Sequence, residues 1–527
     1  MVSRLGRPTR FLPTVLVMLA AAVPLFCLVL LFGGVSFGQV ARVFAVTLAA
    51  VMAAGSLGST IALWREKTFQ TLALTVLLLF FWLGAWEAVY QLGQQPALAG
   101  HSLSDWSTGF HPVRAAMMAA QPWAASGSGT PQVQAVGMFL GIATVIALGL
   151  NAWAVWRIRE WNPSRGVRLR GDRDEEAQAS IWGAEYDLAQ ESAAAGSRSE
   201  VSADRSVAAA ENARSRHVDS QLRRERATFK TRRVWDNPIL WREVRTWAYG
   251  RKILFIRIAY LAAAFAVAAA LYAVSRSGYA LEASEGLLAR IPPAALVLAP
   301  FFLISLVSVN ALAVTSITGE RDGLQLDLLL VTDLSPKEFI LGKLLGVFWV
   351  AGMMVACPIL LCVGLWGAGK LGMENLCYVV GGLLVLDVFV AMLGIHCGMT
   401  YANSRTAQTV SQGTVFFLFL GVITCIVMIV SFGSFHGRLA PFLAFILGGG
   451  VGLYVALGIR NPSPAIGVAS ILVPFATFYA ITSFILEHTL SVFLVTVAAY
   501  GFTTAAMMIP AVYEFDVEKG RDAARQE

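Results

Sequence analysis

Residues 376–399 read LCYVVGGLLVLDVFVAMLGIHCGM, an apolar run that contains a single acidic residue, Asp387. A helix needs roughly 20 predominantly apolar residues to cross the hydrocarbon core of a bilayer, and this run is long enough to do so. Because lipid offers the backbone no hydrogen-bond partners, a segment that crosses it must be helical. This stretch therefore predicts a transmembrane helix.

Similar runs recur along the chain, which has 527 residues, of which 57% are hydrophobic and 14% are charged. Soluble domains are about 25% charged, and a soluble fold has too little interior for this much apolar surface. The sequence therefore predicts an all-α integral membrane protein with about twelve transmembrane helices. The other expected spans lie near residues 11–32, 40–63, 70–91, 133–156, 253–274, 293–318, 339–366, 409–433, 439–458, 465–486 and 489–511.

A long polar segment, residues 157–234, divides the expected helices into two bundles. Its composition cannot bury enough apolar surface to order the segment, so we expect a partly disordered cytoplasmic linker. The linker separates an N-terminal four-helix region, 1–156, from a larger region, 235–512. A cytoplasmic tail, 513–527, follows the larger region. Lys and Arg concentrate in the linker, whereas the loop at 93–132 has few charges. The positive-inside rule then places this loop outside and both termini in the cytoplasm.

The net charge of +7 does not indicate a nucleic-acid-binding protein. The basic residues of the linker are mixed with acidic ones and do not form the basic stripe that such proteins use. Immediately after the linker, residues 234–252 mix Trp and Tyr with Arg and Lys. This pattern favours a helix lying in the membrane interface, and a plain cytoplasmic helix before the next span is the alternative.

The turn between the expected spans 293–318 and 339–366 is more informative than a simple connection. A leucine-rich segment is followed by Ser335, Pro336 and Glu338. Ser335 can cap a helix whose first residue is Pro336, with Glu338 at the third position of a capping box. Such a short, capped helix would give a soluble partner a rigid part of the membrane protein to bind.

This turn resembles the intracellular turn of type-2 ABC transporter permeases. The family pattern is acid–Arg–acid–x–Gly–Thr, a run of leucines, Thr-Pro-Leu-Ser, and then Leu-Gly-Lys. This sequence departs from the pattern at two positions, where Leu324 replaces the usual Thr and Asp333 replaces the usual Pro. In a separate segment, the Asn-Pro-x-x-Trp-Arg-Glu string at 237–243 resembles the entry helix of some members. The matching segments are Glu-Arg-Asp-Gly at 320–323, the leucines at 328–330, Thr-Asp-Leu-Ser at 332–335 and Leu-Gly-Lys at 341–343.

The resemblance implies the membrane subunit of an exporter in a bacterial inner membrane, without a catalytic site of its own. A separate cytoplasmic ABC ATPase, which carries the ATP and magnesium, would dock on the turn at 319–338, and no cofactor would bind to this chain. A second permease copy is the other partner that the resemblance allows. Carried over by position, the ATPase-coupling residues are Glu320, Arg321, Leu334, Ser335, Pro336 and Glu338.

The sequence does not support a nucleotide-binding site within this chain. Gly364 and the residues up to Lys370 match the spacing of a P-loop, but Leu371 stands where the magnesium-binding Ser or Thr should be. Two rivals stay open. One is a membrane enzyme that acts on lipid-linked substrates, and the other is a non-transporting scaffold or sensor whose segment 157–234 binds a regulator.

Two acidic residues within expected spans, Asp387 and Glu87, are the intramembrane polar candidates, because ionisable groups are costly in lipid and point to function. His396 comes nine residues after Asp387, which places it on the opposite face of a helix with about 100° per residue. These two side chains are therefore not expected to form one site. Asp387 belongs either to a structural pair inside the bundle or to the transport path.

Overall fold

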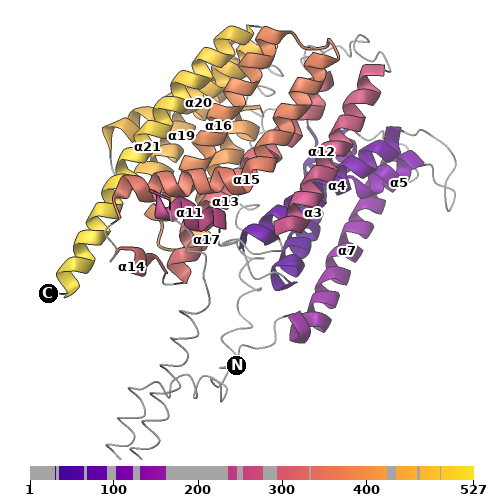
Figure 1. The fold of residues 1–527 in the computed structure, drawn as a ribbon. Helices are drawn as coiled ribbons and strands as arrows, with labels where there is room; N and C mark the ends of the chain where they lie inside the picture. The colour runs from indigo at the N-terminus through magenta and orange to yellow at the C-terminus, as the bar shows by residue number, and fades with distance from the viewer. Residues whose placement is uncertain are drawn as a thin grey trace, which may run out of the picture. The chain divides into compact units, whose positions relative to one another are not determined.

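The computed structural model describes residues 30, 35–64, 68–91, 103–122, 131–161, 235–245, 253–276, 293–323, 325–330, 334–423, 435–459, 463–486 and 488–526. Helices make up nearly all of these residues, and no strand occurs among them (Figure 1). The prediction of an all-α protein is confirmed for this part of the chain. Most of the expected linker and the expected span at 11–32, apart from residue 30, lie outside the described residues.

Within the described ranges, nine helices are long and apolar enough to cross a membrane. They coincide with nine of the expected spans, as a multi-pass membrane protein requires. Of the remaining expected spans, 409–433 is only partly described, and 439–458 belongs to α19 (Phe435–Gly458). The nine segments are Phe37–Trp64, Phe69–Tyr90, Val133–Arg157, Leu254–Val274, Val297–Asp322, Pro336–Gly367, Met373–Thr400, Pro464–Phe484 and Thr489–Val512.

The first half of the chain contains two helices that the sequence analysis did not predict. They occupy the expected exterior loop and were missed because both are short and only weakly apolar. Rings of α4 and α5 hold the first of them in place, since Trp86 and Phe110 stack with centroids 4.2 Å apart and the Trp82 indole N–H donates to the Phe110 carbonyl at 3.0 Å. The helices of this half are α3 (Phe37–Trp64), α4 (Thr68–Gln91), α5 (Leu103–Phe110), α6 (Pro112–Ala120) and α7 (Pro131–Trp161).

An ion pair joins α6 to α4. Arg114 donates through Nη2 and Nε to the two carboxylate oxygens of Glu87, at 2.7 and 2.9 Å, and its guanidinium lies 3.3 Å from the centre of the Tyr90 ring. Such a bidentate pair fixes both partners in one geometry. Glu87, one of the two intramembrane candidates, therefore holds a structural contact in this fold.

His111 caps α6 and gives it a pH dependence. Its Nδ1 accepts from the Arg114 backbone N–H at 3.4 Å, which requires an unprotonated nitrogen. Burial lowers the pKa of His111 from its ordinary value, more than the neighbouring Glu87 raises it. The cap thus contributes fully above the unfolded pKa and is lost as the pH falls through the folded one. Hydrogen exchange in α6 is expected to quicken at acidic pH in the wild type and to change less in His111→Asn. Equal acid sensitivity in both proteins would contradict this role.

The second half of the chain forms most of the buried core. The described parts up to Ala154 and from Asp236 onward form one compact unit, and 155–235 is a second unit. The helices are α11 (Pro238–Arg245), α12 (Ile253–Arg276), α13 (Pro293–Asp322), α14 (Gln325–Leu330), α15 (Pro336–Gly367), α16 (Met373–Thr400), α17 (Ser404–Phe416) with its π-helical extension η4 (Phe417–Gly421), α19, α20 (Pro464–Ile485) and α21 (Thr489–Gln526).

Helix α13 lies at the centre of this half, and small residues let α16 pack closely against it. A Cβ on Gly394 would lie 2.7 Å from the Ala313 Cβ and 2.8 Å from the Asn310 carbonyl oxygen, and Gly398 faces Ile317. The Asn310 amide also donates to the Val390 carbonyl at 2.8 Å. Close backbone approach at small residues is typical of helix packing in membranes.

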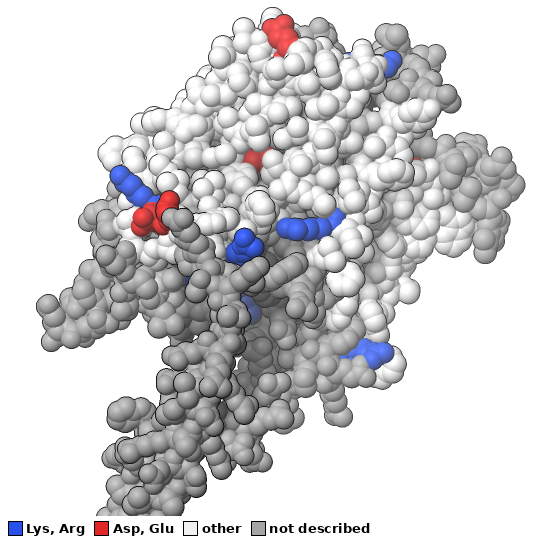
Figure 2. Space-filling model, viewed as in Figure 1, with Lys and Arg blue, Asp and Glu red and all other residues white. Residues whose placement is uncertain are grey.

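The surface of the described helices is largely uncharged. On the face drawn in Figure 2, white side chains cover most of the described surface between its two ends. Many exposed side chains of the described helices are large and apolar, for example Phe265, Leu360 and Ile471, which are all more than half exposed. A soluble protein rarely exposes so much apolar surface, whereas lipid is a suitable solvent for it.

Candidate functional site

The leucine-rich turn lies where α13 ends and α15 begins, with α14 and α11 beside it at the same end of the bundle (Figure 1). The predicted cap at the start of α15 is confirmed. Ser335 Oγ accepts from the Glu338 backbone N–H at 3.3 Å, and the Glu338 carboxylate accepts from the Ser335 N–H at 3.0 Å. Pro336 is the first residue of α15. The start of α15 is therefore fixed by a complete capping box.

A buried lysine connects the three helices that meet here. Lys343, on the second turn of α15, is 1% exposed. Its ammonium group donates to Glu243 of α11 at 2.6 Å and to Glu320 of α13 at 2.6 Å, and it lies 3.3 Å from the Ser316 carbonyl oxygen. Arg242 of α11 also donates to Glu320. We refer to Arg242, Glu243, Glu320 and Lys343 as the ion-pair cluster.

The ion-pair cluster is balanced in charge, with two cations and two carboxylates. Taking any one of these groups out of water costs several kcal/mol, and only the paired arrangement offsets that cost. A buried network of this kind contributes little net stability over apolar packing. It strongly disfavours conformations in which one partner is separated from the others. The cluster therefore links α11, α13 and α15 to one another at this end of the bundle.

A glycine groove on α15 allows α11 to come close enough for these contacts. A Cβ on Gly342 would lie 2.7 Å from the Asn237 side-chain oxygen, and a Cβ on Gly346 would lie 2.8 Å from the Glu243 Cβ. Asn237 caps α11 by accepting from the Leu240 N–H at 2.9 Å, and it also donates to the Glu338 carbonyl at 2.9 Å. Both ends of the segment 237–243 are thus held against the beginning of α15.

The predicted coupling residues occupy two different environments. Glu320 and Leu334 are buried, and Glu320 belongs to the ion-pair cluster. Arg321 is partly buried and donates to the Gly398 carbonyl at 3.0 Å. Ser335 and Glu338 are exposed, and Pro336 is half-buried between them. A soluble partner could contact Ser335 and Glu338 directly. Glu320 and Leu334 are instead buried beneath the turn.

Sequence reasoning missed the other members of the ion-pair cluster as site residues. Lys343 was visible as a cation within an expected span, which is itself a sign of function. Arg242 and Glu243 stood in the segment that resembles an entry helix. Their pairing was not visible, because Glu243 and Lys343 are 100 residues apart in the chain.

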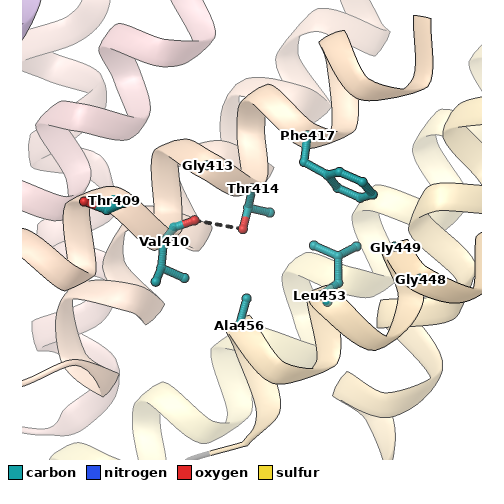
Figure 3. Close-up of a pocket in the computed structure, with 10 residues that line it drawn as sticks. Thr409, Val410, Gly413, Thr414, Phe417, Gly448, Gly449, Leu453 and Ala456 are labelled. Carbon is teal, nitrogen blue, oxygen red and sulfur yellow. Dashed lines mark hydrogen bonds between the residues drawn. The ribbon is translucent and has the colours of Figure 1, made fainter. Parts of the chain in front are cut away.

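Two other kinds of site are a metal centre and a ligand cavity. No group of three or more His, Cys, Asp or Glu side chains in the described ranges could hold a metal ion. A cavity of about 540 Å³ lies between α17 and α19, lined by glycines and apolar side chains together with Thr409 and Thr414 (Figure 3). The Thr414 hydroxyl in its wall already donates to the Val410 carbonyl at 2.9 Å.

His396 and Tyr401 fasten the end of α19 to α16. His396 Nε2 lies 3.0 Å from the Leu457 carbonyl oxygen, and the Tyr401 hydroxyl donates to the Ala456 carbonyl at 2.7 Å. The last carbonyls of a helix have no partner within the helix, and these side chains supply one. His396 therefore has a structural contact and, as expected, no bond to Asp387.

Comparison of the chain with models of known protein families, with curated proteins and with solved structures found no match.

Proposed function

We propose that this chain is the membrane-spanning permease subunit of an ATP-driven exporter of the type-2 ABC class, coupled to a separate cytoplasmic ATPase through the turn at 319–338. The proposal extends to about twelve spans in two bundles joined by the linker, with both termini in the cytoplasm of a bacterial cell. ATP and magnesium would bind to the partner, and a second permease copy would complete the complex. The chain itself would catalyse no reaction.

The observation that supports this proposal best is the ion-pair cluster behind the turn. A subunit that lacks a motor must receive force at a site that does not deform when it is pushed. The exposed edge formed by Ser335 and Glu338 continues into the capped start of α15, and Lys343 links that helix to Glu320 and Glu243. A push on the edge would therefore move α15, α13 and α11 together, which is how contacts that differ between two ATPase states can bias a two-state bundle.

A substitution on the exposed edge tests the docking role. Glu338→Ala removes the carboxylate half of the capping box, together with an exposed charge. We expect several-fold weaker co-purification of a cognate ABC ATPase, with normal membrane insertion. Pro336→Ala should act in the same direction.

The matched control is Glu374→Ala. Glu374 is also an exposed acid in the first turn of a long apolar helix, α16, and it accepts a hydrogen bond from Tyr378 at 2.7 Å. It follows the far end of α15, because α15 runs from the turn to Gly367 and α16 begins at Met373. Equal ATPase recovery from Glu338→Ala, Glu374→Ala and wild type would count against docking on this edge.

The proposed topology has its own test. A reporter fused after Gly127 is expected to report the exterior, and one fused after Ser197 the cytoplasm, because the loop at 93–132 has few charges and the linker is rich in Arg. The opposite pattern would place the turn at 319–338 outside. No cytoplasmic ATPase could then reach it, and the proposed function would fail.

A further inference from the structure

Asp387 is an acidic side chain sealed inside the helix bundle. It lies near the middle of α16, its exposed fraction is 0%, and neither carboxylate oxygen has a hydrogen-bond partner among the described residues. Glu87, the other intramembrane polar candidate, is paired with Arg114. The structural pair that the sequence left open for Asp387 is therefore absent from the described part of the bundle.

A tyrosine close to Asp387 forms its hydrogen bond with another group. Tyr260 of α12 is close enough to Asp387 to interact with it electrostatically. The Tyr260 hydroxyl donates to the Met354 carbonyl at 3.1 Å, and Ser305 of α13 donates to the same oxygen at 2.6 Å. Neither hydroxyl is turned toward the Asp387 carboxylate as a hydrogen-bond donor.

The helices around α16 bring no described cation to Asp387. From Pro293 to Gly319, α13 contains no charged residue, and on α15 Lys343 is engaged in the ion-pair cluster. Arg257 of α12 donates to the Val350 carbonyl at 3.1 Å, and on α17 the basic residue Arg405 lies in the first turn. Besides Lys343 and Asp387 itself, the buried titratable side chains described on α15, α16 and α21 are Cys357, Cys362, His396, Cys397 and Tyr500, and none of them donates a hydrogen bond to Asp387.

A bare carboxylate in this place would be very unfavourable. Removing an ionised carboxylate from water without a partner costs several kcal/mol even after relaxation, and an apolar bundle in lipid offers nothing to offset that cost. The side chain has no exposed surface, and Asp387 is not among the residues that line the cavity between α17 and α19. A proton removes the charge of the carboxylate and needs no space beyond the side chain itself.

We propose that Asp387 binds a proton in this packed conformation and releases it when the bundle opens to water. Opening of the bundle is then linked to proton release. An aspartic acid in water is ionised at neutral pH, so a higher pH favours the open state through mass action. This inference goes beyond the exporter assignment and does not depend on the ATPase.

Infrared spectroscopy of the full-length protein in detergent tests the protonation. The wild type at neutral pH should show a carbonyl stretch of a protonated carboxylic acid, and labelling of aspartate with ¹³C should shift that band without any substitution. The band should be absent in Asp387→Asn and retained in Glu87→Gln. A wild-type spectrum without a ¹³C-sensitive band of this kind would overturn the proposal.

Hydrogen exchange of α16 tests the linkage. After correction for the intrinsic pH dependence of exchange, opening of wild-type α16 should increase with pH by up to about tenfold per unit, the limit for release of one proton. Asp387→Asn, which resembles the neutral acid in shape, should show no such increase. Identical pH dependence in the two proteins would refute proton release on opening, whereas loss of the ATPase in a pull-down would bear only on the proposed function.

Discussion

Replacing Lys343 by methionine is expected to destabilise the protein by about 3–5 kcal/mol, the usual result of removing one partner from a buried ion pair. Methionine matches the length of lysine and fills the same space, so the loss is one of charge and not of packing. Glu243 and Glu320, which both contact the Lys343 ammonium at 2.6 Å, would be left buried beside each other. Arg242 alone would then face two carboxylates.

The size of this effect can be measured by thermal or denaturant unfolding in detergent, followed by the fluorescence of the tryptophans. Lys370→Met is the matched control, because Lys370 is exposed just beyond the far end of the same helix and surface substitutions usually change stability by less than about 0.5 kcal/mol. The double variant Lys343→Met with Glu320→Gln restores charge balance and should recover part of the loss. A Lys343→Met protein as stable as the Lys370→Met protein would show that the cluster is not sealed from water.

The helices of this protein could be predicted from sequence because each long apolar run carries its own signal. The run at 376–399 became α16, and the Ser335–Glu338 cap became the start of α15. Both are local features, determined by residues within a few positions of one another. The short helices α5 and α6 were not predicted, because they depend on contacts with α4 that no local pattern reveals, such as the stacking of Phe110 on Trp86.

The candidate site was only half predictable for the same reason. The exposed edge at Ser335 and Glu338 follows from a capping pattern in one short segment. The burial of Glu320 does not follow from such a local pattern, because it depends on contacts with Lys343 and Arg242. Arg242 lies on a different helix, 78 residues before Glu320 in the chain. The predicted set of coupling residues therefore combined buried and exposed side chains, which have different roles. Glu320 holds the turn from inside, and Glu338 faces outward.

Substitution of Gly346 by alanine is expected to lower the stability of the protein. At an ordinary helix position the same substitution raises it. Alanine in place of glycine inside a helix normally stabilises by roughly 0.5–1 kcal/mol. At Gly346 the new Cβ would lie 2.8 Å from both Cβ and Cγ of Glu243, atoms too near the α11 backbone to swing away. We expect a net loss of about 1–3 kcal/mol, as for other overpacked sites, because α11 must move outward.

Gly352→Ala is the control on the same helix, since nothing lies within 4 Å of its added Cβ, and it should be neutral or stabilising. The displacement of α11 in Gly346→Ala would also lengthen the contact between Glu243 and Lys343. The stability lost through Gly346→Ala should therefore be smaller in a protein that already carries Lys343→Met. A double-mutant cycle measures this difference directly. Strictly additive effects would mean that the groove and the ion-pair cluster are independent. The close approach of α11 would then serve packing alone and would not transmit movement from the turn.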